Sequence, residues 1–263
     1  MAITQTGTIM AVLDATLPEG QLVDRRWLQD RGLDRPAVDY YVRSGKLERI
    51  ARGVYRKPGP PLKWQHVVYS LAELGYRIHV GHLSALGLHG YQHYLELEGR
   101  PETRLYSDTT LPTWIDGVDA GSSLVEMKRS PFTDFEIGIE EIPFGTWEWP
   151  IRYATAERAF LETVSTVSST AEIRRVKLMM DGATNLRPAL LQSVLQGCRQ
   201  VKAKRLFLWL ARDCGHGWYR HLDQNSIELG SGKRQIVKGG VLDDEYLITV
   251  PTKDDDEPKQ PVF

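Results

Sequence analysis

Residues 24–57 hold the most restrictive pattern in the chain, because their capping and turn residues predict two short helices joined by a tight turn. Asp24 and Asp34 each stand where a helix would begin, and an aspartate side chain can accept the free amides of a first helical turn. Gly32 and Gly45 stand where these helices would end, in positions that favour a left-handed backbone. Pro36 fits the first turn of the second helix, where its missing N–H is not needed. The pattern predicts a helix-turn-helix.

A β-hairpin is predicted directly after the second helix. The segments 46–50 and 54–56 are expected as strands, and Gly53 in the tight turn 51–53 allows a positive φ. On the second helix Val38, Tyr41 and Val42 recur at helical spacing, so we expect them to pack on the first helix. With a further helix over Thr8–Leu13, residues 1–60 are predicted to form a winged helix-turn-helix.

Positive charge is concentrated in this predicted module. From Arg35 to Lys63 the chain has eight lysines and arginines against two acids, although its overall net charge is −1. Such a concentration favours an anionic partner, and double-stranded DNA fits a winged helix best. The predicted DNA-binding residues are Arg35, Ala37, Asp39, Tyr40, Arg43 and Ser44 on the outer face of the second helix, and Lys46, Arg49, Arg52, Arg56 and Lys57 on the hairpin. The alternative is a winged-helix module that binds another protein.

The rest of the chain is expected to complete an α+β fold, in which a mixed α/β C-terminal domain follows the winged helix-turn-helix. Residues 61–98 are predicted as a helical connecting segment and residues 99–263 as the mixed domain, with strands near 103–106, 123–127 and 135–142. Helices are predicted from Thr155, from Ser169 through a capping box with Glu172, over Leu190–Cys198 and around Leu206–Leu210. Their outward bases suggest a surface for a protein partner, or simply a solvated face: Arg174, Arg175, Lys177, Arg199, Lys202, Lys204 and Arg205.

Composition excludes several classes of protein. The 263 residues are 41% hydrophobic and 25% charged, which is typical of a soluble globular protein, and no apolar run reaches the roughly 20 residues that cross a bilayer. The N-terminus has no signal-peptide pattern, so we expect a cytoplasmic protein with no membrane partner. Cys198 and Cys214 are expected to be free thiols.

Two motifs have features of a cofactor site, one of a metal site and one of a phosphate-binding loop. We predict that neither binds a cofactor. His79, His82, His89 and His93 lie close in sequence, but no cysteine or metalloprotease-type glutamate accompanies them. The segment Gly230–Lys233 is like part of a phosphate-binding loop, but Arg234 replaces the hydroxyl residue that would hold magnesium. We therefore predict no metal site and no cofactor, and a hairpin turn at 230–233.

An enzymatic alternative rests on a second pattern. The segment Ala120–Ser122, followed by Asp134 and Glu136 in a predicted strand, resembles the glycine-serine turn and paired carboxylates of nucleotidyltransferases. Pro131 interrupts the stretch where those enzymes have a helix. We predict no catalytic residue, and Asp134 with Glu136 is the pair that tests this alternative.

Several segments, in order along the chain, resemble one family. The segments 43–56, 82–90, 156–162, 229–234 and 246–251 are similar to those of AbiEi antitoxins, the transcriptional regulators of AbiE-type type IV toxin-antitoxin systems. The resemblance implies a repressor that binds inverted repeats in its own promoter through the N-terminal domain. It also implies that the C-terminal domain neutralises, directly or indirectly, a co-encoded toxin with a nucleotidyltransferase fold.

Overall fold

The computed structural model describes residues 13, 15–91 and 100–251. Most of the helix predicted over Thr8–Leu13, and His93, lie outside the described residues. The chain divides into two compact units. The first contains Met1–His79, Gly99–Met127 and Glu141–Ile151, and the second contains Val80–Glu98, Lys128–Glu140 and Arg152–Phe263. The domain boundaries expected at residues 60 and 98 stay predictions.

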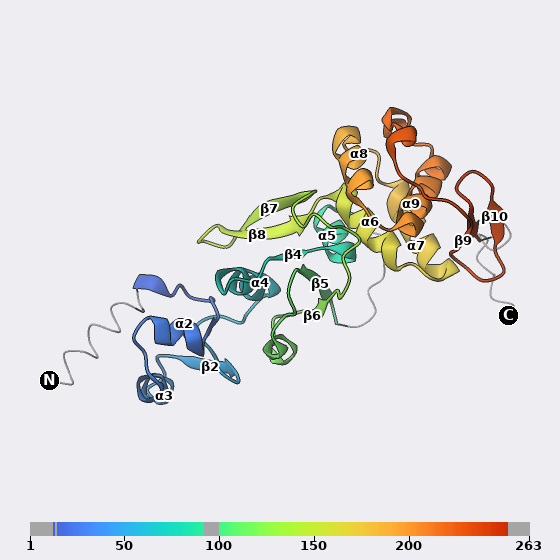
Figure 1. Ribbon diagram of the computed structural model, residues 1–263. Helices are drawn as coiled ribbons and strands as arrows, with labels where there is room; N and C mark the ends of the chain where they lie inside the picture. The colour runs from blue at the N-terminus through green and yellow to red at the C-terminus, as the bar shows by residue number, and fades with distance from the viewer. Residues whose placement is uncertain (1–12, 14, 92–99, 252–263) are drawn as a thin grey trace, which may run out of the picture. The chain divides into compact units, whose positions relative to one another are not determined.

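The two predicted helices of the N-terminal module are α2 (Arg25–Asp30) and α3 (Arg35–Arg43) (Figure 1). The Asp24 carboxylate accepts the Trp27 amide at 2.7 Å, and the Asp34 carboxylate accepts the Ala37 amide at 2.9 Å. Gly32 has a φ of 82°, in the left-handed region that the turn between the helices requires. Both predicted caps are therefore confirmed.

The predicted hairpin follows α3, with strands β2 (Glu48–Ala51) and β3 (Val54–Arg56) around a turn in which Gly53 has a φ of 77°. A short strand that the sequence did not predict, β1 (Val23–Asp24), pairs antiparallel with β3, giving the order β1-β3-β2. The module has its own core, built mainly from Leu28, Leu33, Val38, Tyr41, Leu47 and Tyr55. Helix, turn, helix and hairpin occur in the predicted order.

The first unit continues with α4 (Trp64–Glu73) and two parallel strands, β5 (Glu102–Ser107) and β6 (Ser123–Glu126). A 3-10 helix, η1 (Thr113–Gly117), lies between these strands in sequence. The Leu22 amide donates to the Ser70 hydroxyl at 2.7 Å, which ties the segment before β1 to α4. Val67, Val68 and Leu71 of α4 are buried, as their helical spacing predicts.

A five-stranded sheet has the order β6-β5-β4-β8-β7. Its remaining strands are β4 (Ile78–Val80), β7 (Ile139–Phe144) and β8 (Trp149–Ala154), and β4 pairs with β8 in parallel at Val80 and Tyr153. The prediction of a strand over residues 135–142 is wrong at its beginning. Residues 135–138 form a bend and a turn, in which the main-chain oxygens of Phe135 and Ile137 accept hydrogen bonds from Arg158 Nη1 at 3.1 and 2.6 Å.

Within its described residues, the second unit has five α-helices: α5 (His82–Leu88), α6 (Ala156–Thr166), α7 (Thr170–Asp181), α8 (Pro188–Gly197) and α9 (Val201–Cys214). In Figure 1, α6 to α9 gather in the yellow to orange part of the chain. Ser169 and Glu172 form the predicted capping box of α7. Phe160, Met180 and Phe207 are among the side chains that fill the shared core. None of the helices formed by the described residues is both long enough and apolar enough to span a membrane.

The C-terminal part adds two 3-10 helices, η2 (Gly217–His221) and η3 (Gln224–Ser226), and a small sheet. Its strands β9 (Arg234–Gln235), β10 (Val241–Asp243) and β11 (Ile248–Val250) have the order β10-β11-β9, with β9 and β11 parallel. The hairpin turn predicted at residues 230–233 is therefore wrong, because β9 pairs with a strand that comes later in the chain. The α+β class is confirmed.

Candidate nucleic-acid interface

The outer face of α3 is held toward solvent by its buried face. Val38 and Tyr41 are at most 1% exposed, whereas Arg35, Tyr40 and Arg43 lie on the exposed side. Tyr40 is 51% exposed and packs edge-on against Tyr41 with ring centroids 5.6 Å apart. The helix therefore presents hydrogen-bonding side chains on a rigid support, as a recognition helix requires.

The polar groups on this face make only weak contacts with one another. Arg35 Nε lies 3.9 Å from the Asp39 carboxylate, and both side chains are more than half exposed. Arg43 Nε donates to the main-chain oxygen of Asp39 at 3.2 Å, and the Ser44 hydroxyl donates to that of Tyr41 at 3.2 Å. Exposed contacts of this kind contribute little to stability, so the side chains are available to a ligand. Ala37, also predicted, is half-buried.

The hairpin places further bases in solvent. Lys46, Arg49 and Arg52 are exposed, and Lys57 is half-buried. Arg52 stands in the turn between the strands, and Arg49 Nε donates to the Ala51 oxygen at 3.4 Å. Arg52 is thus the predicted wing base that lies at the hairpin tip.

Arg56 is a correction to the predicted set. Its side chain is 10% exposed, and its Nε donates to the Glu48 carboxylate at 2.8 Å across the hairpin. The remaining guanidinium nitrogens donate to the main-chain oxygens of Pro60 and Gly59 at 2.7 and 3.3 Å. Arg56 therefore fastens the segment after the hairpin to the sheet, and its donors are not available to a phosphate.

Three arginines in and next to α2 were missed by the sequence reasoning, which counted charge only from Arg35 onward. Arg25 and Arg26 open the helix, and Arg31 follows its last residue. Arg31 stacks on the Trp27 ring, 3.6 Å from the centroid, and donates to the Trp27 oxygen. Two adjacent arginines directly after a capping aspartate were the signal that could have identified the first pair.

The second predicted surface, on α7 and α9, does not form as expected, because Lys204 and Arg205 are only 3% and 2% exposed. The Arg205 guanidinium donates to the main-chain oxygens of Leu229, Gly230 and Gly232 at 2.6–3.0 Å. Burial lowers the pKa of Arg205, and these carbonyl dipoles take the place of a carboxylate. Arg205 thus fixes the C-terminal segment to α9.

The other bases of that surface differ in their surroundings. Lys202 Nζ donates to the Val167 oxygen at 2.8 Å, and burial lowers its pKa. Lys177 Nζ lies 2.5 Å from the Asp213 carboxylate. Arg174 is half-buried, while Arg175 and Arg199 are exposed. Of the seven predicted bases, Arg175 and Arg199 remain the most accessible to a partner.

The three residues on which the nucleotidyltransferase alternative rests, Asp134, Glu136 and Ser122, form hydrogen bonds or ion pairs with other groups of the protein. The Asp134 carboxylate accepts the Glu136 amide at 2.8 Å, and Glu136 pairs with Arg152. Neither acid lies in a strand, so they lack the alternating arrangement expected of paired metal ligands. Ser122 is buried, with its hydroxyl 2.8 Å from that of Thr103. The strand with two alternating acids that this resemblance predicts is therefore not formed at Asp134 and Glu136.

The three of these histidines that the structure describes, His79, His82 and His89, each contact the protein. His79 stacks on Tyr106 with centroids 5.2 Å apart, and His82 Nε2 lies 2.9 Å from the Thr166 hydroxyl. His89 Nε2 lies 3.0 Å from the Ala154 oxygen.

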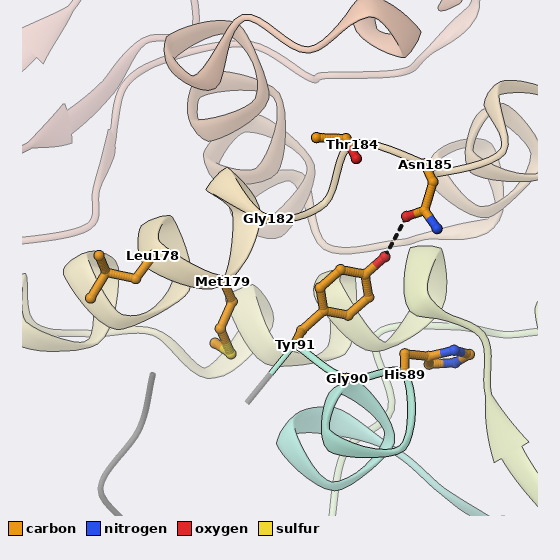
Figure 2. A pocket seen from close by; sticks show the side chains of 8 residues that line it. All are labelled: His89, Gly90, Tyr91, Leu178, Met179, Gly182, Thr184 and Asn185. Atoms are coloured by element: carbon orange, nitrogen blue, oxygen red, sulfur yellow. Dashed lines mark hydrogen bonds between the residues drawn. The ribbon is translucent and has the colours of Figure 1, made fainter. Parts of the chain in front are cut away.

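His89 also lines a pocket of about 400 Å³ in the second unit, drawn in Figure 2. There the Tyr91 hydroxyl donates to the Asn185 side-chain oxygen at 2.8 Å. The pocket's polar side chains are thus partly engaged by the protein itself.

Two capped helices, a hairpin and an exposed basic helix face define the N-terminal part as a helix-turn-helix type of module. A family model described as the AbiEi antitoxin N-terminal domain of a transcriptional regulator matches residues 8–97. A second model, described as a transcriptional regulator and AbiEi antitoxin of a type IV toxin-antitoxin system, matches residues 101–251. The chain therefore belongs to the AbiEi antitoxin family of transcriptional regulators.

One solved structure extends the comparison to the fold. The RV2827C protein from Mycobacterium tuberculosis is 14% identical, with a TM-score of 0.55 and coverage of 96% of this chain and 93% of that protein. At this identity the likeness shows a shared fold. None of the curated proteins matches the chain.

Proposed function

We propose that this antitoxin is a sequence-specific DNA-binding repressor of its own operon. In this proposal α3 enters the major groove of a promoter site, where Arg35, Tyr40 and Arg43 read base edges. Arg49 and Arg52 on the hairpin contact backbone phosphates and fix the orientation of the module. An inverted repeat in the promoter would present the same sequence to two copies of the protein.

The observation that supports this proposal best is that the arginines of the module differ in exposure and in hydrogen bonding. The Arg56 guanidinium donates to the Glu48 carboxylate and to main-chain oxygens. By contrast, three arginines are exposed on the outer side of α3 or at the hairpin tip: Arg35, Arg43 and Arg52. An exposed arginine cluster on a rigid support is favourable where an anionic ligand balances it.

The second part of the proposal concerns the toxin. We propose that residues 99–263 neutralise, directly or indirectly, a co-encoded toxin with a nucleotidyltransferase fold. The match of residues 101–251 to an AbiEi antitoxin model of a type IV toxin-antitoxin system supports the antitoxin role. The protein itself is proposed to act without catalysis. If Asp134→Ala or Glu136→Ala removed a nucleotide-transfer activity of the purified protein, this non-enzymatic proposal would fail.

The test of DNA binding is a gel-shift titration on the DNA upstream of the protein's own gene, with unrelated duplex as competitor. Two salt concentrations separate the phosphate contribution from base reading, because affinity from phosphate contacts falls with salt. A complex that survives the competitor is expected. Equal displacement by unrelated DNA would contradict sequence-specific binding and direct the search to protein partners.

Single substitutions assign the roles. Arg52→Ala should reduce the slope of log affinity against log salt by about 0.9 and weaken binding to all duplexes alike. Arg35→Ala or Tyr40→Ala should cost about 1 to 3 kcal/mol on the specific site alone. Arg175→Ala, an exposed arginine on α7, is the matched control and should change neither quantity. An unchanged salt slope for Arg52→Ala would remove this residue from the interface.

A further inference from the structure

The start of α2 is fixed to the tip of the hairpin. Strand β1 ends at Asp24, and the next residue, Arg25, donates its amide to the Gly53 oxygen at 3.0 Å. Arg52 precedes Gly53 in the same turn. This main-chain bond places the first turn of α2 beside the wing tip, although the two bonded residues are 28 positions apart in sequence.

Three arginines stand next to this main-chain bond in sequence: Arg25 and Arg26 on the α2 side and Arg52 on the hairpin side. Among the described residues, none of the three forms an ion pair, whereas nearby Arg56 pairs with Glu48. The neighbouring Asp24 carboxylate is engaged as the cap of α2, where it accepts the Trp27 amide. This joint between α2 and the hairpin therefore has three positive charges and no carboxylate bonded to them within the part of the chain that the structure describes.

Arg25 adds an observation of a different kind. Its Nε is buried and has no hydrogen-bond partner among the described residues. An unsatisfied charged donor is unfavourable, so the Arg25 side chain would gain a favourable bond by turning its guanidinium toward an acceptor that a ligand supplies. A guanidinium group presents its donors in a planar fork that matches the oxygens of a phosphate.

We infer that Arg25, Arg26 and Arg52 form a second phosphate-binding site, which holds the backbone of the duplex next to the recognition helix. The inference rests on the proposed function, because the phosphates belong to the DNA that α3 reads. The site combines side chains from α2 and from the hairpin. The DNA backbone would therefore be bound by two elements that the hydrogen bond between Arg25 and Gly53 already connects. Its contribution to affinity is independent of sequence.

The test is fluorescence anisotropy of the full-length protein with two labelled duplexes of equal length, the upstream DNA and a scrambled version, over a salt series. Arg25→Ala and Arg26→Ala should each weaken binding to both duplexes by the same factor. Each should lower the salt slope by about 0.9, as expected for one lost phosphate contact. Arg25→Lys keeps the charge but loses the fork, so it should keep the slope and lose only part of the affinity.

Arg31→Ala is the matched control, because it removes one arginine charge next to the same helix while that guanidinium is stacked on Trp27. It should leave the slope unchanged. Circular dichroism melting separates binding from folding, and the exposed Arg26 provides the test if Arg25→Ala does not fold.

The outcomes separate this inference from the proposed function. If Arg25→Ala and Arg26→Ala bind with the wild-type slope while Arg35→Ala and Arg52→Ala are weakened, the second site is wrong and the repressor stands. If the wild-type protein binds neither duplex, both proposals are overturned.

Discussion

Gly20 shows how a single residue controls the docking of the N-terminal segment on α4. Its φ is 87°, and a Cβ at this position would lie 2.5 Å from Cδ2 of the His66 ring. The ring is fixed, because its Nδ1 accepts the Lys63 amide at 2.8 Å and it packs nearly perpendicular to the rings of Phe144 and Trp149. Burial lowers the pKa of His66, so the neutral ring persists at pH 7.5.

We expect Gly20→Ala to lower the free energy of unfolding by more than Gly32→Ala does. Gly32 has nearly the same φ, 82°, but a methyl group added there would have no neighbouring atom within 4 Å. Both substitutions should share a backbone cost of about 1 to 2 kcal/mol, and the contact with His66 should add to it only at Gly20. Urea denaturation at pH 7.5 measures both variants. Equal losses would mean that the His66 ring moves aside freely.

At the scale of elements, α6 organises the second unit through a buried ion pair. The side chains of Arg158 and Glu162 are both 0% exposed, and Arg158 Nε donates to the Glu162 carboxylate at 2.8 Å. The other carboxylate oxygen accepts the His82 amide at 2.9 Å, at the start of α5. Arg158 also holds the main-chain oxygens of Phe135 and Ile137, so one helix positions two separate segments.

Glu162→Gln should destabilise the protein by about 3 to 5 kcal/mol, because it leaves the Arg158 charge buried without its counter-ion. The matched control in the same unit is Glu136→Gln, since Glu136 is 53% exposed where it pairs with Arg152. That exposed pair should contribute about 0 to 1 kcal/mol. Urea unfolding curves compare the two variants, and similar midpoints would argue against a structural role for the buried pair.

The same elements show what the sequence could predict. Helix caps were predicted correctly at Asp24, at Asp34 and at the Ser169–Glu172 pair. Each of these contacts spans only three residues, so the local sequence is enough to reveal it. Side chains whose partners lie far away were wrongly predicted as exposed. Arg205 finds its acceptors 24 to 42 residues along the chain, and no periodic pattern reports such a contact.

The interface residues follow the same rule at shorter range. The exposed face of α3 was predictable from helical spacing, because Val38 and Tyr41 define the opposite, buried face. Arg56 was not, since its role depends on how the chain turns back at Gly59 and Pro60. The position of Arg25 beside the hairpin tip depends on the pairing of β1 with β3, which the sequence analysis did not predict.

For the whole molecule, the proposed repression and the proposed neutralisation are assigned to different parts of the chain, which two separate family models match over residues 8–97 and 101–251. Arg35 and Arg52 lie in the first unit and are exposed, so replacing them removes no core contact. The helices α6 to α9 share a separate core in the second unit. Loss of DNA binding should therefore leave the second unit folded.

The double variant Arg35→Ala with Arg52→Ala should lose repression of a reporter under the native promoter but still neutralise the co-encoded toxin. Toxin and antitoxin are expressed from unrelated inducible promoters, so that the antitoxin cannot act by silencing the toxin gene. Growth rescue equal to that of the wild type is expected, with immunoblots confirming equal amounts of protein. If the variant accumulates normally and yet fails to rescue growth, neutralisation requires the DNA-binding face itself, and the separation of the two activities is wrong.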